Sequence, residues 1–439
     1  MPEGSLIEIN GTLIPFEKGQ KGDKVTGMKN QQQKILETMN YNYNGNLISI
    51  KAVGIPEFSL TPEHPILTIE RVRDGNKKLC YSNIHKWKKC NELVSTFKKS
   101  DCLVFPKYKN YSNITEINLE EYHKLLTHKQ RSLNKIPLNK SLMIICGLYV
   151  AEGWSTKTKN DMIVSWSLSK DETNTLAKDL QTALSEFGIY STIRTHPSSE
   201  NGINVICHSR QLGMFFKKEF GERAWKKRIP QFIMDANNEN VEVFIKYAIL
   251  GDGHLHEYEI PNQKLTFYCT TSPQLAFQFQ KLLSKINLFG LLYRKKPSSS
   301  KMINGREIVG RHDVYTIILS NRHSEKLWNL DHKQYKNKCY DTIHETDEYF
   351  YLPIKKINLK KYNGKVYNYK TPDATFQINN VITHNSDHGF QKMTVCEFLR
   401  CTLSELRERI KNPADYFIIL AYKGEKGERI RHEMEKVRR

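Results

Sequence analysis

The sequence predicts a multidomain protein in which an all-β unit is interrupted by an α+β unit with a pseudo-twofold repeat and is followed by a short helical tail. The chain has 439 residues, enough for roughly three units at about 150 residues per domain. Short strand patterns occur near the start and again after Phe350, and a tandem repeat lies between them. A split β unit around an inserted α+β unit follows from these observations.

The all-β unit is predicted from alternating apolar residues separated by turn signals. SLIEINGTLIPFEKGQKGDKV, NLISIKAVGI, HPILTIERVRDGNKKLCYS and DCLVFPK all read as short strands, with NG and DG turns between them. The pattern returns in GKVYNYKT, ATFQINN and VIT. We therefore assign residues 1–110 and 346–385 to the two parts of one β unit.

The α+β unit is predicted at residues 136–345, after a polar linker at residues 111–135 that has the pattern of a connector or of short helices. LMIICGLYVAEGW and VFIKYAILGDGHL open two similar halves. Each half reads as an apolar helix, a strand, an amphipathic helix ending at Phe-Gly and two strands. The last segment, residues 386–439, carries a capping-box pattern and an Asn-Pro helix start, which predict a helical tail.

The charge balance favours a polyanionic partner. Lys and Arg number 67 against 47 Asp and Glu, a formal net charge of +20 that is spread along the chain, and nucleic acid is a more frequent partner of such a chain than a membrane. The sequence has no apolar run of transmembrane length and no signal-peptide pattern at its start. Its nine cysteines occur without a CxxC pair, which favours reduced thiols over zinc or disulfides. We expect a cytoplasmic protein that is not secreted and does not bind membranes.

The two apolar helices each end in an acid followed by glycine, Glu152-Gly153 and Asp252-Gly253. A carboxylate in the last helical turn faces the negative end of the helix dipole, at a cost of roughly 0.3–1 kcal/mol. A single acid of this kind is ordinarily a solvated helix end. Two in register within a repeat predict a shared site if the helices pack about a pseudo-twofold axis. Oxygen ligands that converge there suit Mg²⁺, which activates water and stabilises a leaving phosphate oxygen.

CGLYVAEGW and KYAILGDGH resemble the two signature helices of a single-chain, two-motif LAGLIDADG homing endonuclease. The resemblance implies that Glu152 and Asp252 bind the metal ions and that the strands form a saddle along the major groove of double-stranded DNA. KKRIPQFI, residues 226–233, resembles the block before the second helix, and this implies that Lys227 assists the chemistry. The interface glycine of the family is present as Gly147 but is replaced by Tyr247 in the second helix, which places close helix approach there in question.

Other features agree with DNA binding but are not specific to it. Strands such as MIVSWSLS and DVYTIILS alternate, so one face can pack on helices while the other meets base edges, as in any half-buried sheet. Basic clusters at residues 226–228 and 294–296 suit phosphate contacts, although each alone is ordinarily a solvated surface.

The split β unit resembles the Hint splicing domain of inteins. VYNYKTPDATFQINNVITHNS looks like the C-terminal intein blocks, which ends the element at His384 and Asn385, with Ser386 as the first downstream residue. TPEHP matches the family's TxxH block and supplies Thr61 and His64. The resemblance covers nearly all of residues 1–385 and implies that residues 386–439 begin a downstream host segment, the C-extein.

The splicing chemistry requires residues of these types. On this resemblance, the side-chain amide of Asn385 would attack its own carbonyl carbon, and the imidazole of His384 would protonate the leaving amine. Thr61 and His64 would polarise or protonate the upstream peptide, and Ser386 would accept the transferred acyl group.

The sequence departs from the intein pattern at three places. By alignment of Gly4-Ser5, the first nucleophile, Cys or Ser, falls one position before Met1, so the chain as written is expected to perform at most C-terminal cleavage. Ala374 and Asn368 stand where many inteins have His and Asp, which predicts slower final steps.

We therefore expect a monomeric intein-encoded endonuclease that makes a Mg²⁺-dependent double-strand break in the intein-less host gene. The alternatives are an RNA-binding intron maturase and a catalytically inactive DNA-binding relic.

Overall fold

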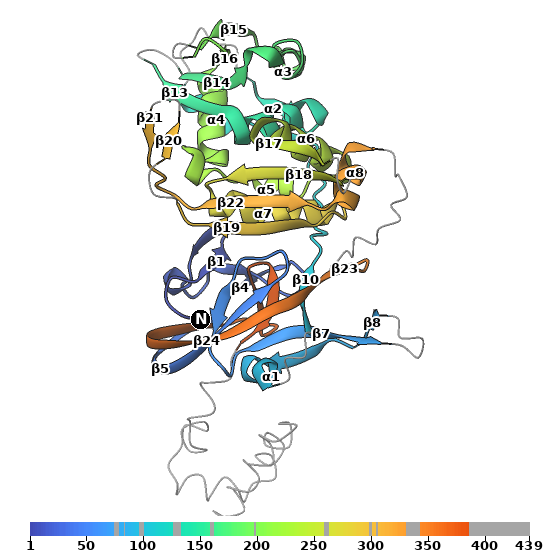
Figure 1. Cartoon of the computed structure of the whole chain (residues 1–439). Coiled ribbons are helices and arrows are strands. Elements are labelled where there is room, and N and C mark those ends of the chain that lie inside the picture. The colour runs from blue at the N-terminus through green and yellow to red at the C-terminus, as the bar shows by residue number, and fades with distance from the viewer. Residues whose placement is uncertain are drawn as a thin grey trace, which may run out of the picture. The chain divides into compact units, whose positions relative to one another are not determined.

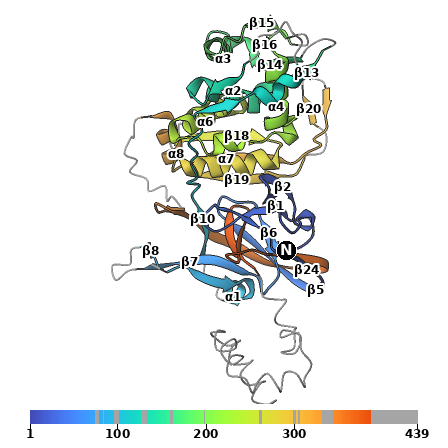
Figure 2. The ribbon, with the colours of Figure 1, turned by 180° about the vertical axis from the view of Figure 1, so that it is seen from behind.

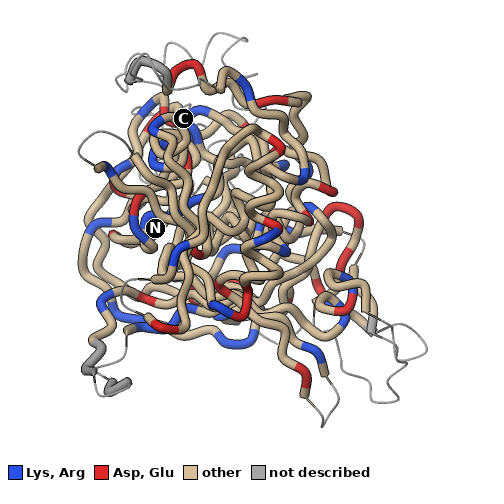
Figure 3. The backbone as a smooth tube through the Cα atoms, turned by 90° about the horizontal axis from the view of Figure 1, so that it is seen from above, with Lys and Arg blue, Asp and Glu red and all other residues tan. Residues whose placement is uncertain are grey.

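The computed structural model describes residues 1–73, 79–82, 84–95, 101–125, 133–158, 162–196, 199–258, 263–297, 301–303, 306–330 and 343–385. The chain divides into two compact units, Met1–His384 and Asn385–Arg439 (Figure 1). The predicted helical tail at 386–439, including Ser386, lies outside the described residues. No described helix is long and apolar enough to cross a membrane. Lys and Arg are interspersed with Asp and Glu along the chain (Figure 3).

The predicted β unit consists of strands from both ends of Met1–His384. Its first sheet has the order β2-β1-β3-β4 and its larger sheet follows β25-β26-β7-β10-β24-β5-β6, with β23, β8 and β9 attached. The elements are β1 (Leu6–Ile9), β2 (Thr12–Pro15), β3 (Lys24–Thr26), β4 (Gln32–Lys34), β5 (Glu37–Ala52), β6 (Phe58–Leu60), β7 (Pro65–Arg73), β8 (Leu79–Tyr81), β9 (Lys86–Lys89), α1 (Cys90–Ser95), β10 (Asp101–Pro106), β23 (His344–Glu345), β24 (Tyr349–Lys370), β25 (Thr375–Ile378) and β26 (Val381–His384).

Long-range pairing closes this β unit. Strand β5 pairs with β24 over nearly its whole length, from Glu37 opposite Lys370 to Ala52 opposite Ile354. The two parts of the chain that flank the insertion therefore form one structure. The predicted NG turn is also present, because Asn10 and Gly11 both have positive φ and join β1 to β2, as a tight hairpin of this type requires.

The inserted α+β unit has two halves with the same topology. The sheet orders β13-β14-β16-β15 and β17-β18-β22-β19 both place the last strand between the second and third. The first half contains α2 (Lys140–Glu152), β13 (Gly153–Lys157), β14 (Met162–Ser169), α3 (Leu176–Glu186), β15 (Ser191–Thr195), β16 (Gly202–His208) and α4 (Arg210–Phe220). The second contains α5 (Gln231–Met234), α6 (Asn238–Asp252), β17 (Gly253–Tyr258), β18 (Gln263–Thr270), α7 (Pro273–Lys285), β19 (Gly290–Lys295), β20 (Lys301–Ile303), β21 (Arg306–Ile308), β22 (Val314–Leu319) and α8 (Asn321–Trp328).

Details of the predicted repeat need correction. Two strands, not one, precede each amphipathic helix, because an additional strand, β13 or β17, begins at the glycine of each acid-glycine pair. Helix α3 ends at Phe187-Gly188 as predicted, with Gly188 in the left-handed region. Helix α7 instead ends at Lys285, where Asn287 takes the left-handed turn, and Phe289-Gly290 leads into β19.

The described residues of the segment predicted as a linker or short helices, 111–125 and 133–135, are part of the packed structure. The segment contains β11 (Glu116–Asn118) and a 3₁₀ helix at Glu120–Leu125, and β11 pairs with β12 (Lys135–Pro137). Leu119 and Tyr122 are buried in the same core as α2 and α6. Because these two side chains are buried there, the segment before α2 packs against the inserted unit.

Helix α7 joins the inserted unit to the β unit. One face packs on its own sheet, where Phe279 stacks on Tyr268 with 4.2 Å between ring centroids. The Gln280 side-chain amide donates hydrogen bonds of 2.7 Å both to the Gly54 carbonyl of the β unit and to the Gly290 carbonyl of β19. Lys281 forms an ion pair with Glu8 of β1. The helix is consequently enclosed on both sides.

Candidate active site

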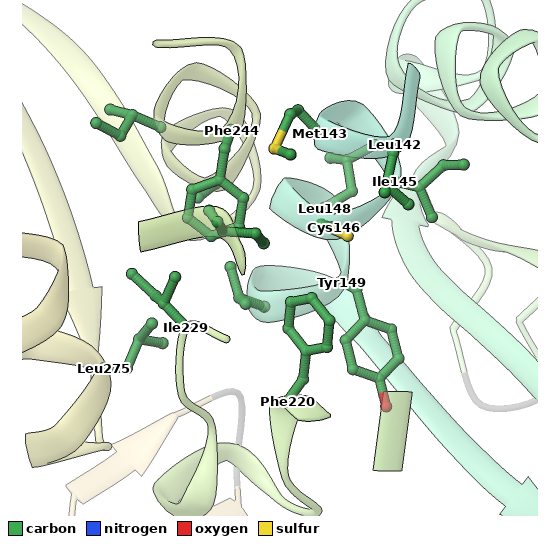
Figure 4. Packing of buried hydrophobic residues seen from close by; sticks show 14 of the residues in the cluster. Leu142, Met143, Ile145, Cys146, Leu148, Tyr149, Phe220, Ile229, Phe244 and Leu275 are labelled. Carbon is green, nitrogen blue, oxygen red and sulfur yellow. The ribbon is translucent and has the colours of Figure 1, made fainter. Parts of the chain in front are cut away.

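Helices α2 and α6 lie side by side where the two halves meet (Figures 1 and 2). Both begin at an asparagine cap, since the Asn139 and Asn237 side chains accept from the backbone N–H three residues on. Apolar residues fill the junction, and Figure 4 shows Met143 and Leu148 of α2 beside Phe244 of α6 in one core.

Gly147 allows the two helices to approach closely. A Cβ at this position would lie 2.7 Å from the Phe244 carbonyl oxygen and 2.9 Å from the Tyr247 Cβ, so only glycine fits without a shift. Tyr247, which replaces the expected second glycine, does not prevent the approach. Its side chain leaves the contact, and its hydroxyl donates a hydrogen bond of 2.8 Å to Asp179 on α3.

The C-terminal ends of α2 and α6 meet, and this brings together Glu152 and Asp252, which we call the acid pair. At Gly251, directly before Asp252, a Cβ would lie 2.5 Å from the Ala151 Cβ and 3.3 Å from the Glu152 Cγ. The small residues beside each acid therefore allow the two helix ends to touch.

The acid pair is electrostatically strained. Burial, and then the negative charge of Asp252, raise the pKa of Glu152 to about 7. Asp252 borders a hollow of about 200 Å³ and is accessible from it, but protein atoms on its other sides desolvate the carboxylate and raise its pKa to about 7. The positive charge of Lys227 opposes this rise. Positive charge supplied to the pair would relieve the strain.

Lys227 is a buried member of this site, and its ammonium lies at the C-terminal end of α2. Nζ donates hydrogen bonds of 2.7 Å to the carbonyl oxygens of Tyr149 and Gly153 and lies 3.6 Å from the centroid of the Tyr149 ring. Burial lowers the pKa of Lys227 to about 7, against the opposing influence of Asp252. The side chain is only 5% exposed, so it is a fixed part of the core and not a surface charge.

The acid pair fits a divalent cation. Two carboxylates with raised pKa values offer hard oxygen ligands whose repulsion a metal ion would relieve. Within the described ranges, no group of three or more His, Cys, Asp or Glu side chains is placed to hold a metal ion. The other positions around a bound ion would be filled by neutral protein oxygens, water or substrate, and Mg²⁺ bound with phosphates usually keeps several waters.

Glu152→Gln is expected to stabilise the metal-free protein at pH 8 but not at pH 4.5. The pKa of Glu152 is raised on folding, so the stability it contributes is complete below its unfolded pKa of 4.5 and is lost as the pH rises through about 7. Allowing for its partial exposure, the gain at pH 8 should be about 1–2 kcal/mol. Thermal unfolding in a metal chelator at both pH values measures it, with exposed Glu186→Gln as control. An equal change in stability at pH 8 and pH 4.5 would show that the Glu152 carboxylate is not destabilised by its surroundings.

The sheets next to the acid pair each present one face away from the helices. Val164, Trp166, Tyr268 and Ile317 point to the core, so the alternate residues form the opposite face, which we call the outer face. In the first sheet a cross-strand row runs Trp154, Ser165, Ile206 and Thr192. The matching row in the second sheet runs His254, Phe267, Ile318 and Leu291. No Asp or Glu occupies an outer-face position of these eight described strands.

A second constellation lies in the β unit. Thr61 and His64 stand in the turn between β6 and β7 and are 2% and 1% exposed. His384 ends β26, and its ring meets that of Trp87 on β9 edge to face, with 5.1 Å between centroids. We call these four residues the junction cluster.

Sheet register places the members of the junction cluster at one end of the β unit. Thr383, next to His384, pairs with Ile66, which is two residues beyond His64. The ring of Phe376, which pairs with Thr383, lies 6.0 Å from that of His64. The structure thus places the predicted Thr61, His64 and His384 together, and Asn385, the last described residue, is 9% exposed.

The sequence did not indicate the contacts made by Tyr149 and Trp87. Tyr149 reads as one more apolar residue of its helix, yet its ring and carbonyl hold the Lys227 ammonium. Trp87 precedes His384 by almost 300 residues, and no local pattern joins them.

Comparison with known families agrees with part of this architecture. Residues 139–218, which include α2 and the first sheet, match the family model described as a LAGLIDADG-like domain. Among solved structures, the homing endonuclease I-DmoI in complex with DNA and Ca is 15% identical, with a TM-score of 0.32, and covers 44% of this chain and 88% of that chain. The homing endonuclease I-WcaI bound to its DNA recognition sequence is also 15% identical, with a TM-score of 0.29, 48% of this chain and 85% of that chain. Structural likeness at this level supports no inference about function.

Curated relatives match a much longer stretch. An uncharacterized protein of Methanocaldococcus jannaschii is 26% identical over 82% of this chain and 48% of its own length. An ATP-dependent DNA helicase of Thermococcus kodakarensis is 22% identical over 83% of this chain and 34% of its own length. An iron-sulfur cluster assembly SufBD family protein of Mycobacterium bovis is 23% identical, with 85% and 41% coverage. The chain thus spans between a third and a half of the length of these relatives.

Proposed function

We propose that residues 136–345 form a DNA endonuclease that hydrolyses phosphodiester bonds with a divalent metal ion, Mg²⁺ by preference. The observation that carries the proposal is the acid pair with raised pKa values, placed with Lys227 where the helices α2 and α6 of the two matched halves end side by side. A pseudo-twofold arrangement suits duplex DNA, whose two strands are themselves related by local twofold symmetry.

The outer faces supply the surface for DNA. They carry no acidic side chain among the described strand residues, whereas Arg194 and Lys295 are exposed there. A polyanion can approach such a face without meeting fixed negative charge, and a net charge of +20 favours the encounter. Alternating strands can then present side chains to the major groove.

Each residue of the site has a defined part in the proposed reaction. Glu152 and Asp252 would hold the metal ion, which when bound would activate a water molecule and stabilise charge on the phosphate oxygens. Lys227 acts as a positioning residue, because its ammonium fixes the carbonyls at the end of α2 and lowers the pKa of Asp252 toward the ionised form that a metal ion requires.

The relatives support an inserted mobile element. A helicase and an iron-sulfur cluster assembly protein have unrelated names, yet each matches more than four-fifths of this chain with less than half of its own length. An element inserted into unrelated hosts would produce this distribution. The β unit closed around the inserted unit supports an intein of the Hint type, with the host gene lacking the element as the DNA target.

DNA cleavage tests the proposed function directly. We expect the protein with Mg²⁺ to linearise a plasmid that carries the host gene with the element removed and its flanks joined. The matched control is the same gene with the element still present, which should remain uncut because the target is interrupted. A metal chelator should abolish cleavage. Failure to cut the joined gene with either Mg²⁺ or Mn²⁺ would refute the proposal, and binding without cutting would favour the inactive DNA-binding relic.

The junction cluster favours a second reaction, C-terminal self-cleavage. The Asn385 side-chain nitrogen would attack its own carbonyl carbon to form a succinimide, and the Ser386 amine would leave with a proton from His384. The contact between Trp87 and His384 holds the imidazole at the end of β26.

Wild-type protein is expected to release two fragments that meet between Asn385 and Ser386. Asn385→Ala should give only the full-length chain, and His384→Ala should slow cleavage by roughly 10²-fold, the lower range for loss of a general acid. Intact-mass measurement over time shows both effects. Persistence of uncleaved wild type, or fragments from Asn385→Ala, would exclude this reaction.

A further inference from the structure

The outer faces of the two sheets differ in chemistry although their registers match. Ser165 in the first sheet corresponds to Phe267 in the second, because each is paired with the first residue after the acid-glycine step, Trp154 or His254. By the same register, Arg194 corresponds to Tyr293. Ser165 is 0% exposed, so the first sheet offers no side chain to DNA at that position, whereas the matched Phe267 is partly exposed. At the other position, exposed Arg194 is replaced by the aromatic Tyr293.

We propose that the first sheet reads its half of the DNA site by hydrogen bonds to base edges, whereas the second reads its half largely by apolar contact with thymine methyl groups. This inference rests on the proposed function and specifies the substrate. The major groove presents the thymine C5 methyl group, against which phenylalanine packs well, while arginine pairs with two acceptors of guanine.

The first sheet offers hydrogen-bonding groups that are already oriented. The Trp154 indole N–H donates to the Ser167 hydroxyl over 3.3 Å, and this hydroxyl donates to the Asn204 Oδ1 over 2.9 Å. Arg194 is exposed on the adjacent strand and is paired in register with Asn204. Its guanidinium is therefore open to a base edge of a duplex that lies on this face.

The second sheet offers an apolar surface at the matched positions. The Phe267 ring stacks on that of His254, with 4.9 Å between centroids and 9° between planes. Phe267, Ile318 and Leu265 are partly exposed and are not among the described residues that pack into the hydrophobic cores. Three apolar side chains are therefore partly exposed on an outer face whose described strand residues include no Asp or Glu.

DNA is a better occupant of this apolar surface than another protein because of its surroundings. The surface is continuous with β17, which begins directly after Asp252 of the acid pair, and exposed Lys295 and Lys296 stand at the end of β19. A duplex that reaches the acid pair along the second sheet must cover Phe267. Positive charge at the rim suits phosphates, and the apolar centre suits the groove floor.

The test uses the full chain and a library of randomised duplexes. Bound duplexes are selected with Ca²⁺ present and sequenced, and the preferred duplex is then remade with uracil in place of thymine in one half or the other. This exchange removes only the methyl group and leaves the protein unchanged. Loss of about 0.8 kcal/mol per buried methyl corresponds to about fourfold weaker binding for each contacted thymine.

Two variants identify the half of the site that each sheet reads. Phe267→Ser, which introduces the residue of the matched position in the first sheet, should abolish the uracil effect and the thymine preference in one half only. Arg194→Ala should relax a guanine preference in the other half. Uracil in that other half should change binding by less than about twofold.

The possible outcomes separate this inference from the proposed function. If joined host DNA is cut but uracil has no effect, or weakens binding equally in both halves, the thymine inference fails and the nuclease stands. If Phe267→Ser keeps the full uracil effect, the assignment to the second sheet fails. A protein that selects no sequence at all overturns both.

Discussion

Replacing Asp252 by asparagine is expected to lower the rate of DNA cleavage by about 10³-fold, because several kcal/mol of metal-assisted stabilisation of the transition state are lost. Asparagine preserves the size of the side chain but removes the negative charge. Asp252 borders the hollow, whereas Glu152 is more enclosed, so the substitution removes the more accessible of the two proposed ligands. Single-turnover cleavage at saturating DNA measures the loss.

DNA binding by this variant should be unchanged or tighter, since one negative charge near the phosphates has been removed. Exposed Asp171→Asn is the matched control and should cleave like wild type. Cleavage by Asp252→Asn within tenfold of wild type would remove Asp252 from the metal site. Simultaneous loss of binding and cleavage would indicate misfolding and would direct the test to Glu152→Gln.

Lys227→Met is expected to lower cleavage by roughly 10²-fold near pH 7 and to move the pH profile to higher pH. The ammonium of Lys227 lowers the pKa of Asp252, so its removal raises that pKa above about 7 and a larger fraction of the carboxylate stays protonated at neutral pH. The fold-loss is of the size expected for loss of a pKa-tuned group. Cleavage rates measured from pH 6 to pH 9 test this.

Partial recovery at pH 9 distinguishes the electrostatic role from a merely structural one. The Tyr149 and Gly153 carbonyls lose their donor in Lys227→Met at every pH, so a purely structural defect would persist across the range. Lys226→Met, which alters the exposed neighbour, is the matched control and should retain the wild-type profile. A normal profile for Lys227→Met would remove Lys227 from the electrostatics of the site.

The acid pair could be located from the sequence because repetition carries geometric information. Two apolar helices that end in the same acid-glycine step, in halves with one topology, must bring equivalent ends together if they pack about a common axis. The same argument cannot supply the helix separation. That distance depends on Gly147 meeting the Phe244 carbonyl, and the sequence could not show that Tyr247 would turn outward to Asp179.

The contacts that the sequence could not show are those between residues far apart in the chain. The pairing of β5 with β24 joins segments more than 300 residues apart, and neither strand contains a pattern that specifies its partner. Similarly, the polar segment at 111–135 reads as a connector because it carries few apolar residues. Leu119 and Tyr122 are buried in the core that α2 and α6 share, and Ile117 and Leu133 pack against it. Composition predicts average burial, whereas individual side chains determine where a segment is held.

Helix α7 couples the inserted unit to the β unit. Its buried apolar residues pack in the core of the inserted unit, whereas Gln280 and Lys281 contact the β unit. Loss of this helix would therefore remove contacts from both units. On the proposed function, the acid pair can be lost by point mutation without disturbing these contacts, whereas deletion of the second half would uncover the β unit at Gly54 and Glu8. We therefore expect degenerate descendants to keep α7 after the acids have gone.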